Sequence, residues 1–182
     1  MKNKMLTLAL TAIATVFQCS QASACTGITL ASKDSTQILA RTIEWGGSDL
    51  NSRYVIVPRG YTQQSYVPGG TDGMKFTARY GYVGLAVEQK EFVAEGLNEA
   101  GLSAGLFYFP NYGKYEAFQP ALKAESIADL QLVSWILGSC RTVDEVMEAV
   151  KKVHVIAHRP PVPLPFTGVL PICPAVRLSW KL

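Results

Sequence analysis

The stretch QASACTG, residues 21–27, decides how the rest of this sequence is interpreted. A run of small residues ends in Cys25, and a segment rich in β-branched residues follows at once. The small residues Ala22-Ser23-Ala24 form the pattern after which a signal peptidase cuts. The stretch therefore raises the prediction that Cys25 becomes the first residue of the mature chain.

The residues before this stretch agree with a secretory leader. Lys2 and Lys4 form a positive head, and an uncharged apolar run extends from Met5 to Phe17. Head, apolar run and cut site stand in the order of a signal peptide. The run is too short to cross a bilayer as a permanent helix, so we expect no stable membrane insertion. The sequence predicts a signal peptide over residues 1–24 and export to the periplasm or the extracellular space.

A cysteine in first position carries a nucleophile and a base on one residue. The reactive form of its thiol is the thiolate. A free α-amine, whose pKa is ordinarily about 8, can accept the thiol proton near neutral pH. Two other interpretations of Cys25 remain open at this point. It is acylated if residues 22–25 are a lipobox, although Ala22 stands where Leu is usual, or it is a plain cysteine beside a strand.

Composition excludes several classes of protein. With 182 residues, 48% hydrophobic and 17% charged, the chain is long and apolar enough for one domain with a core. Loss of Lys2 and Lys4 lowers the formal charge from +3 to +1, which predicts no nucleic-acid partner. Three cysteines remain after the leader, an odd number that argues against a disulfide framework. His154 and His158 lack neighbours at metal-ligand spacing, so no metal site is expected.

The pattern along the chain predicts strands first and helices afterwards. Alternating and β-branched runs predict strands at residues 26–32, 37–45 and 54–58, and longer strands broken by glycines at 74–87 and 92–110. A loop is predicted over 59–73 and a tight turn at 98–101. Apolar residues at helical spacing predict helices at 125–139 and 142–153. Thr142 and Glu145 form a capping box, and Glu148 with Lys152 an i,i+4 pair. This order is typical of an α+β fold with helices layered on an antiparallel sheet.

Six segments together carry a family resemblance. They run in order as CTGITL, ARTIEW, VIVPRG, AEGLNEAGL, FYFPNYGKY and LGSCRTVDEV, from Cys25 to about Val155. In this combination the sequence resembles the choloylglycine hydrolases, which include bile salt hydrolases and penicillin V acylases. The resemblance implies an N-terminal nucleophile hydrolase with an αββα sandwich, of which this chain holds the N-terminal half. It implies no cofactor and no metal.

The resemblance also implies roles for four residues. Cys25 attacks the amide that joins an acyl group to an amine, which in bile salts is glycine or taurine. Arg41 matches the arginine beside the nucleophile, where a guanidinium favours the thiolate. Glu44 stands where many members have Asp and would hold the α-amine. Tyr108 matches the position whose backbone N–H helps form the oxyanion hole. The implied partner is a small-molecule amide, and a homo-oligomer is compatible with the full-length parent.

The end of the sequence departs from the family. Residues 158–182 hold six of the ten prolines, and no Asp or Glu follows Glu148. We interpret this segment as a Pro-rich tail that follows a frameshift, because a shifted frame can encode two strand-like segments there. The prolines at 160, 161, 163 and 165 predict that the tail cannot supply regular strand pairing. The choloylglycine hydrolase-like part therefore extends over residues 25–157.

Two functions from different classes remain. The first is an exported amidase that acts on conjugated bile salts, with penicillin V as the alternative substrate. The second is a truncated, non-catalytic product, because the asparagine that completes the family's oxyanion hole has no match here. A lipid-anchored binding protein is a more distant third.

Overall fold

The computed structural model describes residues 25–34, 36–43, 49–108, 115–158 and 174–179. For Tyr108 and for residues 174–179 it describes the backbone alone. The predicted signal peptide, Glu44 and the prolines between 160 and 171 lie outside the described residues.

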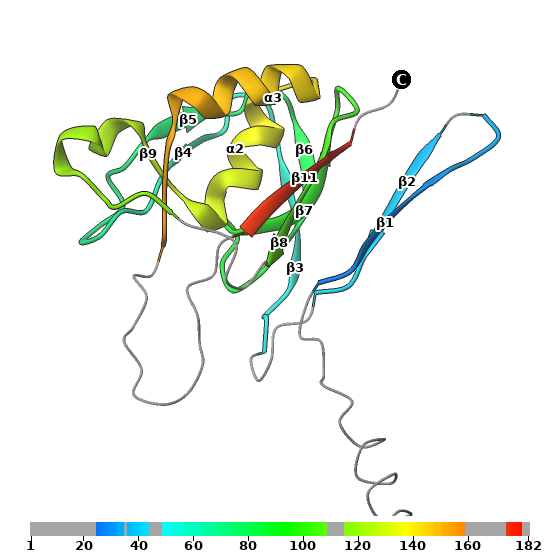
Figure 1. Ribbon diagram of the computed structural model, residues 1–182, viewed down its shortest axis with the longest axis horizontal. Helices are drawn as coiled ribbons and strands as arrows, with labels where there is room; N and C mark the ends of the chain where they lie inside the picture. The colour runs from blue at the N-terminus through cyan, green and yellow to red at the C-terminus, as the bar shows by residue number, and fades with distance from the viewer. Residues whose placement is uncertain (1–24, 35, 44–48, 109–114, 159–173, 180–182) are drawn as a thin grey trace, which may run out of the picture.

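A five-stranded antiparallel sheet forms the centre of the molecule (Figure 1). Its strands lie side by side in the order β11-β8-β7-β6-β3. Their bounds are β3 Arg53–Val57, β6 Tyr82–Ala86, β7 Val93–Asn98, β8 Ser103–Tyr108 and β11 Pro174–Ser179. Alternate residues face opposite sides of such a sheet, so one face can pack against helices while the other packs elsewhere.

The helices cover one face of this sheet. They are α2 (Leu132–Ser139) and α3 (Val143–Ala149), and three short 3₁₀ turns accompany them: η1 Pro120–Glu125, η2 Asp129–Gln131 and η3 Val150–Lys152. Val133, Ile136 and Leu137 of α2 are buried in the core against β7 and β8. Gly96 of β7 lies directly beneath this helix, because a Cβ there would come within 2.6 Å of Leu137 Cδ1.

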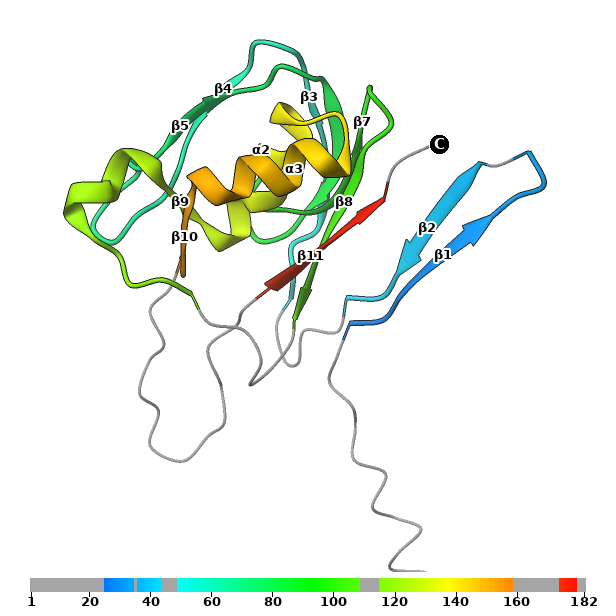
Figure 2. The same cartoon turned by 45° about the horizontal axis from the view of Figure 1, so that its top comes forward.

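A separate hairpin lies on the opposite face of the sheet. It consists of β1 (Gly27–Ala31) and β2 (Gln37–Arg41), paired antiparallel with Gly27 opposite Arg41. Figures 1 and 2 both place this hairpin and the helices on opposite sides of the sheet. The described part of the chain therefore has a helix layer, a sheet and one hairpin of a further layer.

Two small sheets complete the described fold. β4 (Thr62–Gln64) pairs antiparallel with β5 (Lys75–Thr77), and β9 (Ser126–Ala128) pairs parallel with β10 (His154–Ile156). No helix among the described residues is long and apolar enough to cross a membrane.

Two predictions for individual elements were wrong. The predicted loop over 59–73 contains β4. The predicted strand over 74–87, broken by glycines, divides into β5 and β6 as expected. The predicted helix over 125–139 begins only at Leu132, because residues 126–128 form β9. There the backbone bonds to other segments: Ser126 O accepts from Met74 N, and Ala128 N donates to Ser65 Oγ.

The features predicted for the second helix are partly present. Thr142 Oγ1 accepts from Glu145 N at 3.1 Å, as a capping box requires. The Glu145 carboxylate accepts from Arg141 N rather than from Thr142 N. Glu148 pairs with Lys151 at 2.6 Å and not with Lys152.

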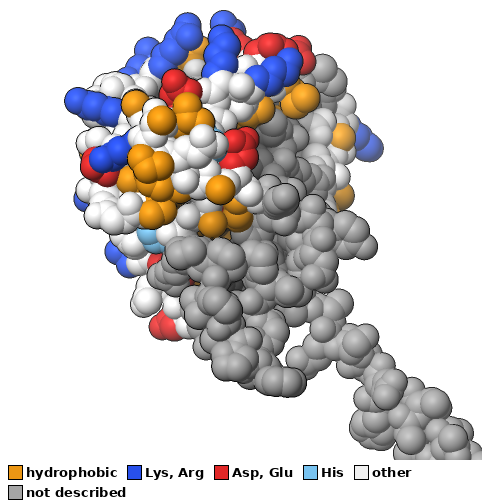
Figure 3. Space-filling model, turned by 60° about the vertical axis from the view of Figure 1, so that its left-hand side comes forward, with side chains coloured by type: hydrophobic (Ala, Val, Ile, Leu, Met, Phe, Trp, Pro, Cys, Tyr) orange, Lys and Arg blue, Asp and Glu red, His pale blue; other side chains and the backbone are white. Residues whose placement is uncertain are grey.

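On the face shown in Figure 3, Lys and Arg side chains lie beside Asp and Glu side chains, so the charge there is mixed.

The expectation that the tail supplies no strand pairing was also wrong. Pro174–Ser179 forms β11, which runs antiparallel along the whole of β8, from Ser103 to Tyr108. Pro174 stands at the first position of this strand, where the missing N–H is tolerated. The tail thus covers the edge that β8 would otherwise expose.

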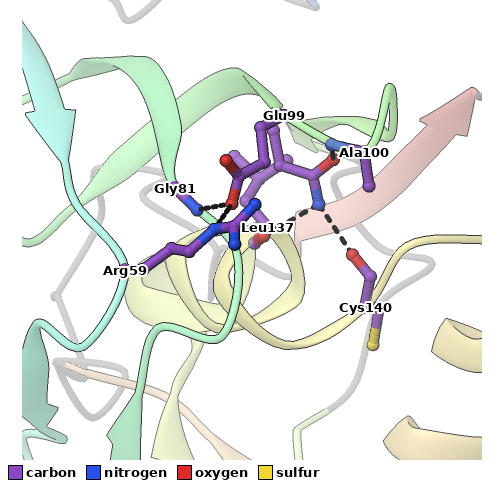
Figure 4. A network of polar contacts seen from close by, with 7 residues as sticks. Arg59, Gly81, Glu99, Ala100, Leu137 and Cys140 are labelled. Atoms are coloured by element: carbon purple, nitrogen blue, oxygen red, sulfur yellow. Dashed lines mark hydrogen bonds and ion pairs between the residues drawn. The ribbon is translucent and has the colours of Figure 1, made fainter.

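Asn98 has a larger structural role than the turn that the sequence predicts. Its buried side-chain amide donates to Leu137 O and Cys140 O at 2.9 and 2.7 Å, at the end of α2 (Figure 4). Its side-chain oxygen accepts from the backbone N–H groups of Ala100 and Leu102. Four hydrogen bonds from one side chain thereby fix the β7–β8 turn to the helix layer.

Replacing Asn98 should therefore destabilise the fold. We expect Asn98→Ala to lower the free energy of unfolding by about 2–4 kcal/mol, because buried partners lose their hydrogen bonds. The neighbouring Glu99→Gln is the matched control, since Glu99 bonds the exposed Arg59 and exposed pairs contribute little. Urea denaturation of both variants measures the difference, and an equal loss of stability in both would contradict this role.

Candidate active site

The hairpin places Thr26, which follows Cys25, next to Thr42, which follows Arg41. Thr42 N donates to Thr26 O at 2.9 Å, and Thr26 N donates to Thr42 Oγ1 at 3.2 Å. Cys25 directly precedes Thr26, at the end of the hairpin away from its turn. Its thiol is half-buried and free. Antiparallel pairing thus brings together two strand ends that are sixteen residues apart in the sequence.

Arg41 points from the hairpin onto the sheet. Its Nη1 donates to two backbone carbonyls, Leu106 O on β8 at 2.5 Å and Ala94 O on β7 at 3.3 Å. The side chain is only 6% exposed. A buried guanidinium needs such acceptors, because burial of an unpaired charge is strongly unfavourable.

Two further groups complete the surroundings of this guanidinium. Its central carbon lies 4.4 Å from the centroid of the Phe107 ring, a cation–π distance. Its Nε lies 3.8 Å from Oε2 of Glu95 on β7. Gly105, opposite Glu95 in the sheet, lies beside this guanidinium, and a Cβ on it would be in ordinary van der Waals contact with Arg41 Nη1, at 3.8 Å.

Glu95 is a site residue that the sequence analysis missed. Burial raises the pKa of its carboxyl, and the charge of Arg41 acts in the opposite direction. A carboxylate inside the otherwise apolar and small run FVAEGL of an alternating strand was the signal that could have identified it. The charged pair Arg41 and Glu95 therefore lies between the hairpin and the sheet.

The other two predicted site residues are described only in part. The Tyr108 backbone ends β8, directly after Phe107, so the sheet brings it to the same corner as Arg41. Its side chain is not described, and Glu44 lies outside the described residues. The structure thus brings Arg41 close to the end of β8, and the hairpin joins Cys25 to Arg41.

The second described thiol has a very different environment. Cys140 is 3% exposed, and burial, with the nearby charge of Glu145, raises the pKa of its thiol to about 11. It stays protonated at neutral pH and is a poor nucleophile. Among the cysteines whose surroundings are described, Cys25 alone is accessible enough for catalysis.

The histidines meet carboxylates that the sequence spacing did not indicate. His154 Nε2 lies 2.8 Å from Glu116 Oε2, and the backbone N–H of His158 donates to the buried Asp129. Burial raises the pKa of Asp129, while its hydrogen bonds lower it. The first pair joins residue 116 to β10, and the second joins η2 to the segment that follows β10. In the part of the chain that the structure describes, no three His, Cys, Asp or Glu side chains could hold a metal ion together.

Comparison with known proteins decides the family. Residues 25–169 match the linear amide C–N hydrolases of the choloylglycine hydrolase family. The chain belongs to the choloylglycine hydrolase family. The match begins at Cys25 and includes the hairpin, four strands of the sheet (β3, β6, β7 and β8) and both helices, so the resemblance seen in the sequence is confirmed.

Curated relatives and solved structures agree with this assignment. A bile salt hydrolase/transferase of Bifidobacterium longum is 26% identical over 134 residues, which are 74% of this chain and 41% of that protein. A bile salt hydrolase/transferase of Clostridium perfringens is 25% identical, over 72% of this chain and 39% of that protein. The chain thus spans about two fifths of the length of these relatives.

Two solved structures share the fold. The conjugated bile acid hydrolase of Clostridium perfringens superposes with a TM-score of 0.62 and 23% identity, over 86% of this chain and 45% of that one. The penicillin V acylase of Agrobacterium tumefaciens superposes with a TM-score of 0.64 and 18% identity, over 84% of this chain and 42% of that one. The predicted N-terminal nucleophile hydrolase fold is confirmed, with less than half of the matched chains covered.

The charge pair at the site gives a direct test of its geometry. We expect Arg41→Gln to raise the pKa of the Glu95 carboxyl further, because the opposing positive charge is lost while an amide can still donate to the carbonyls that hold the hairpin, so burial remains. Carboxyl ¹³C NMR titration of both proteins measures this pKa. Arg53→Met, which removes a charge from an exposed site, is the control and should leave it unchanged. An unchanged or lower pKa in the Arg41 variant would show that the two groups do not interact.

Proposed function

We propose that this protein derives from an exported cysteine amidase that cleaves the amide of glycine- or taurine-conjugated bile salts. One observation carries the proposal: the family match begins at Cys25, and the hairpin joins Cys25 to the buried Arg41. The curated relatives that match include bile salt hydrolase/transferases, which supports bile salts as the substrate class.

The reaction follows from the chemistry of an N-terminal cysteine. The α-amine of Cys25 accepts the thiol proton, and the sulfur attacks the amide carbon of the substrate. The backbone N–H of Tyr108 donates to the oxygen on which negative charge develops. The protonated α-amine then gives its proton to the leaving amine, and a thioester to Cys25 remains. Water hydrolyses this thioester and releases the free acid.

Arg41 and Glu95 act on this reaction through position and charge. The guanidinium stands beside the nucleophile and favours a negatively charged sulfur. Because Arg41 is bonded to carbonyls of both β7 and β8, it also fixes the hairpin end that carries Cys25 relative to the end of β8. Glu95 limits the net positive charge of this corner. Glu44 is proposed to hold the α-amine by hydrogen bonding.

Penicillin V is the second candidate substrate. The proposed oxyanion donor belongs to Tyr108, as in penicillin V acylases, where many bile salt hydrolases carry Asn. Because the donor is a backbone group, this difference leaves the chemistry unchanged and affects only the surroundings of the substrate. The amide class is the same for both substrates.

The first test concerns the start of the mature chain. Protein recovered from outside the cytoplasm should begin at Cys25 with a free α-amine, because Ala22-Ser23-Ala24 precedes it. N-terminal sequencing together with the intact mass measures this. A chain that begins at Met1, or a cysteine that carries an acyl group, would exclude the proposed nucleophile.

The second test replaces the nucleophile. In a version with its reading frame restored after residue 157, Cys25→Ser should abolish release of glycine or taurine, since the α-amine activates a hydroxyl far less well. Cys140→Ala is the control and should retain activity, because the Cys140 thiol is buried and protonated. Retention of most of the rate by the Cys25 variant would contradict the proposal.

The third test concerns the sequence as given. We expect the 182-residue chain to hydrolyse bile salts or penicillin V very poorly beside the frame-restored version. Loss of one oxyanion donor alone typically lowers the rate by about 10²–10³-fold. Amine release by the two purified proteins measures this, and comparable turnover would show that residues 25–182 suffice for a working site.

A further inference from the structure

A cavity of about 260 Å³ lies beside β3, the strand at which the described sheet ends. In the sheet order β6 and β7 separate β3 from β8, so the cavity lies away from the corner at which Arg41 bonds β8. Val55 and Val57, which line it, belong to the hydrophobic core or pack against it, so the cavity is on the helix side of the sheet. Its apolar walls also include Pro58 and Tyr61.

One buried polar side chain reaches this cavity from β4. Gln63 lines the cavity and is only 8% exposed. Its Nε2 donates to the Tyr82 hydroxyl at 2.9 Å, whereas its Oε1 is buried and accepts from no group among the described residues. Buried amide oxygens are almost always hydrogen-bonded. An unpaired one on a residue that lines a cavity therefore points to a ligand that donates a hydrogen bond.

The hydrogen bonds around Tyr82 fix which end of the Gln63 amide is unpaired. The Ser134 hydroxyl donates to Glu91 O at 2.9 Å, so the Ser134 oxygen is left to accept from other groups. Burial raises the pKa of Tyr82, and hydrogen bonding to Gln63 and Ser134 opposes this rise. Because Ser134 accepts, the Tyr82 hydroxyl donates to it, and the Tyr82 oxygen accepts from Gln63. The amide nitrogen therefore faces Tyr82, and the unpaired atom is the acceptor Oε1.

The charged residues that line the cavity offset each other. They are Lys90 and Glu91, and Lys90 Nζ lies 3.8 Å from Glu91 Oε1. The pair favours neither a cationic nor an anionic ligand. Mostly apolar walls with one polar group that fixes the orientation are typical of small-molecule sites, and drug-sized ligands need about 300 Å³ or more. The cavity therefore suits a ligand that is uncharged and small.

We propose that this cavity binds a small uncharged alcohol or phenol whose hydroxyl donates to Gln63 Oε1. The apolar part of the ligand contacts Val55, Val57 and Tyr61. A hydroxyl satisfies the buried oxygen, whereas a hydrocarbon, an ether or a carboxylate brings no hydrogen to donate. An ammonium also donates, but the Glu91 carboxylate that would balance its charge already lies beside Lys90. The site uses no residue of the proposed catalytic corner.

NMR titrations of the full chain with phenol and with toluene test the proposal. Toluene has nearly the shape of phenol but carries a methyl group in place of the hydroxyl. Both probes should shift the methyl signals of Val55 and Val57, which line the cavity, and the shifts should saturate. Phenol alone should shift the side-chain amide signals of Gln63, because only its hydroxyl donates to Oε1.

Variants of two neighbouring glutamines separate the hydrogen bond from the apolar contact. Gln63→Met removes the acceptor and keeps the length of the side chain. It should weaken phenol binding at least about tenfold, as expected when a hydrogen bond to a buried group is lost, and leave toluene binding as it is. Gln64→Met is the matched control and should leave the binding of both probes unchanged, because Gln64 is the next residue of β4 but is exposed and does not line the cavity.

Each outcome decides the question. A larger loss for phenol than for toluene in the Gln63 variant, with the Gln64 variant unchanged, supports the proposal. Three results would overturn it: phenol leaves the Val55 and Val57 signals unshifted, toluene shifts the Gln63 amide as phenol does, or the Gln63 variant weakens both probes equally or not at all. Circular dichroism shows whether the variants fold. If the Gln63 variant does not, the Gln63 amide signals of the unchanged protein decide between phenol and toluene.

Discussion

The position of the hairpin depends on one buried charge. Arg41 carries its guanidinium from β2 into a space where only 6% of the side chain meets solvent. Burial of an unpaired charge is strongly unfavourable, so the charge must find acceptors. Two strands supply them through Leu106 O and Ala94 O, and Glu95 and the Phe107 ring add charge and π density. A two-stranded hairpin alone is marginally stable, so this cluster is what holds β1 and β2 against the sheet.

The same constraint arranges the proposed chemistry. Cys25 lies at the end of the hairpin where Thr26 and Thr42 are hydrogen-bonded to each other. Tyr108 ends β8, the strand whose Leu106 carbonyl accepts from Arg41. The proposed nucleophile and the proposed oxyanion donor therefore belong to separate layers that the Arg41 side chain joins. On the helix side, Asn98 joins the same β7–β8 unit to α2 through buried hydrogen bonds. The central strands are thus fixed from both faces.

Local patterns in the sequence predicted most strands and the α+β order. The alternation of apolar and polar residues and the strand preference of β-branched residues depend on only a few neighbouring residues. Tertiary contacts overrode these patterns elsewhere. Residues 126–128 have helical spacing, but Ser65 and Met74 bond their backbone and β10 pairs with them, so they form β9.

Glu95 was not predicted because its role exists only when the hairpin lies above β7, which no local pattern encodes. The strand at Pro174–Ser179 was missed for a related reason: prolines dominate the tail, whereas the unpaired edge of β8 favours any extended segment within reach. Family motifs predicted Cys25, Arg41 and Tyr108 together as site residues, although 83 residues of sequence separate the first from the last.

Amide hydrogen exchange of Arg41→Met, followed by mass spectrometry of peptides, tests most directly whether this arginine holds the hairpin. The account predicts that peptides from residues 26–43 lose most of their protection, while those from α2 and β6 keep theirs. Unchanged protection in the hairpin would contradict the account, because the hairpin would then be held by other contacts. A uniform loss across the whole chain would contradict it as well, since Arg41 would then support the fold in general.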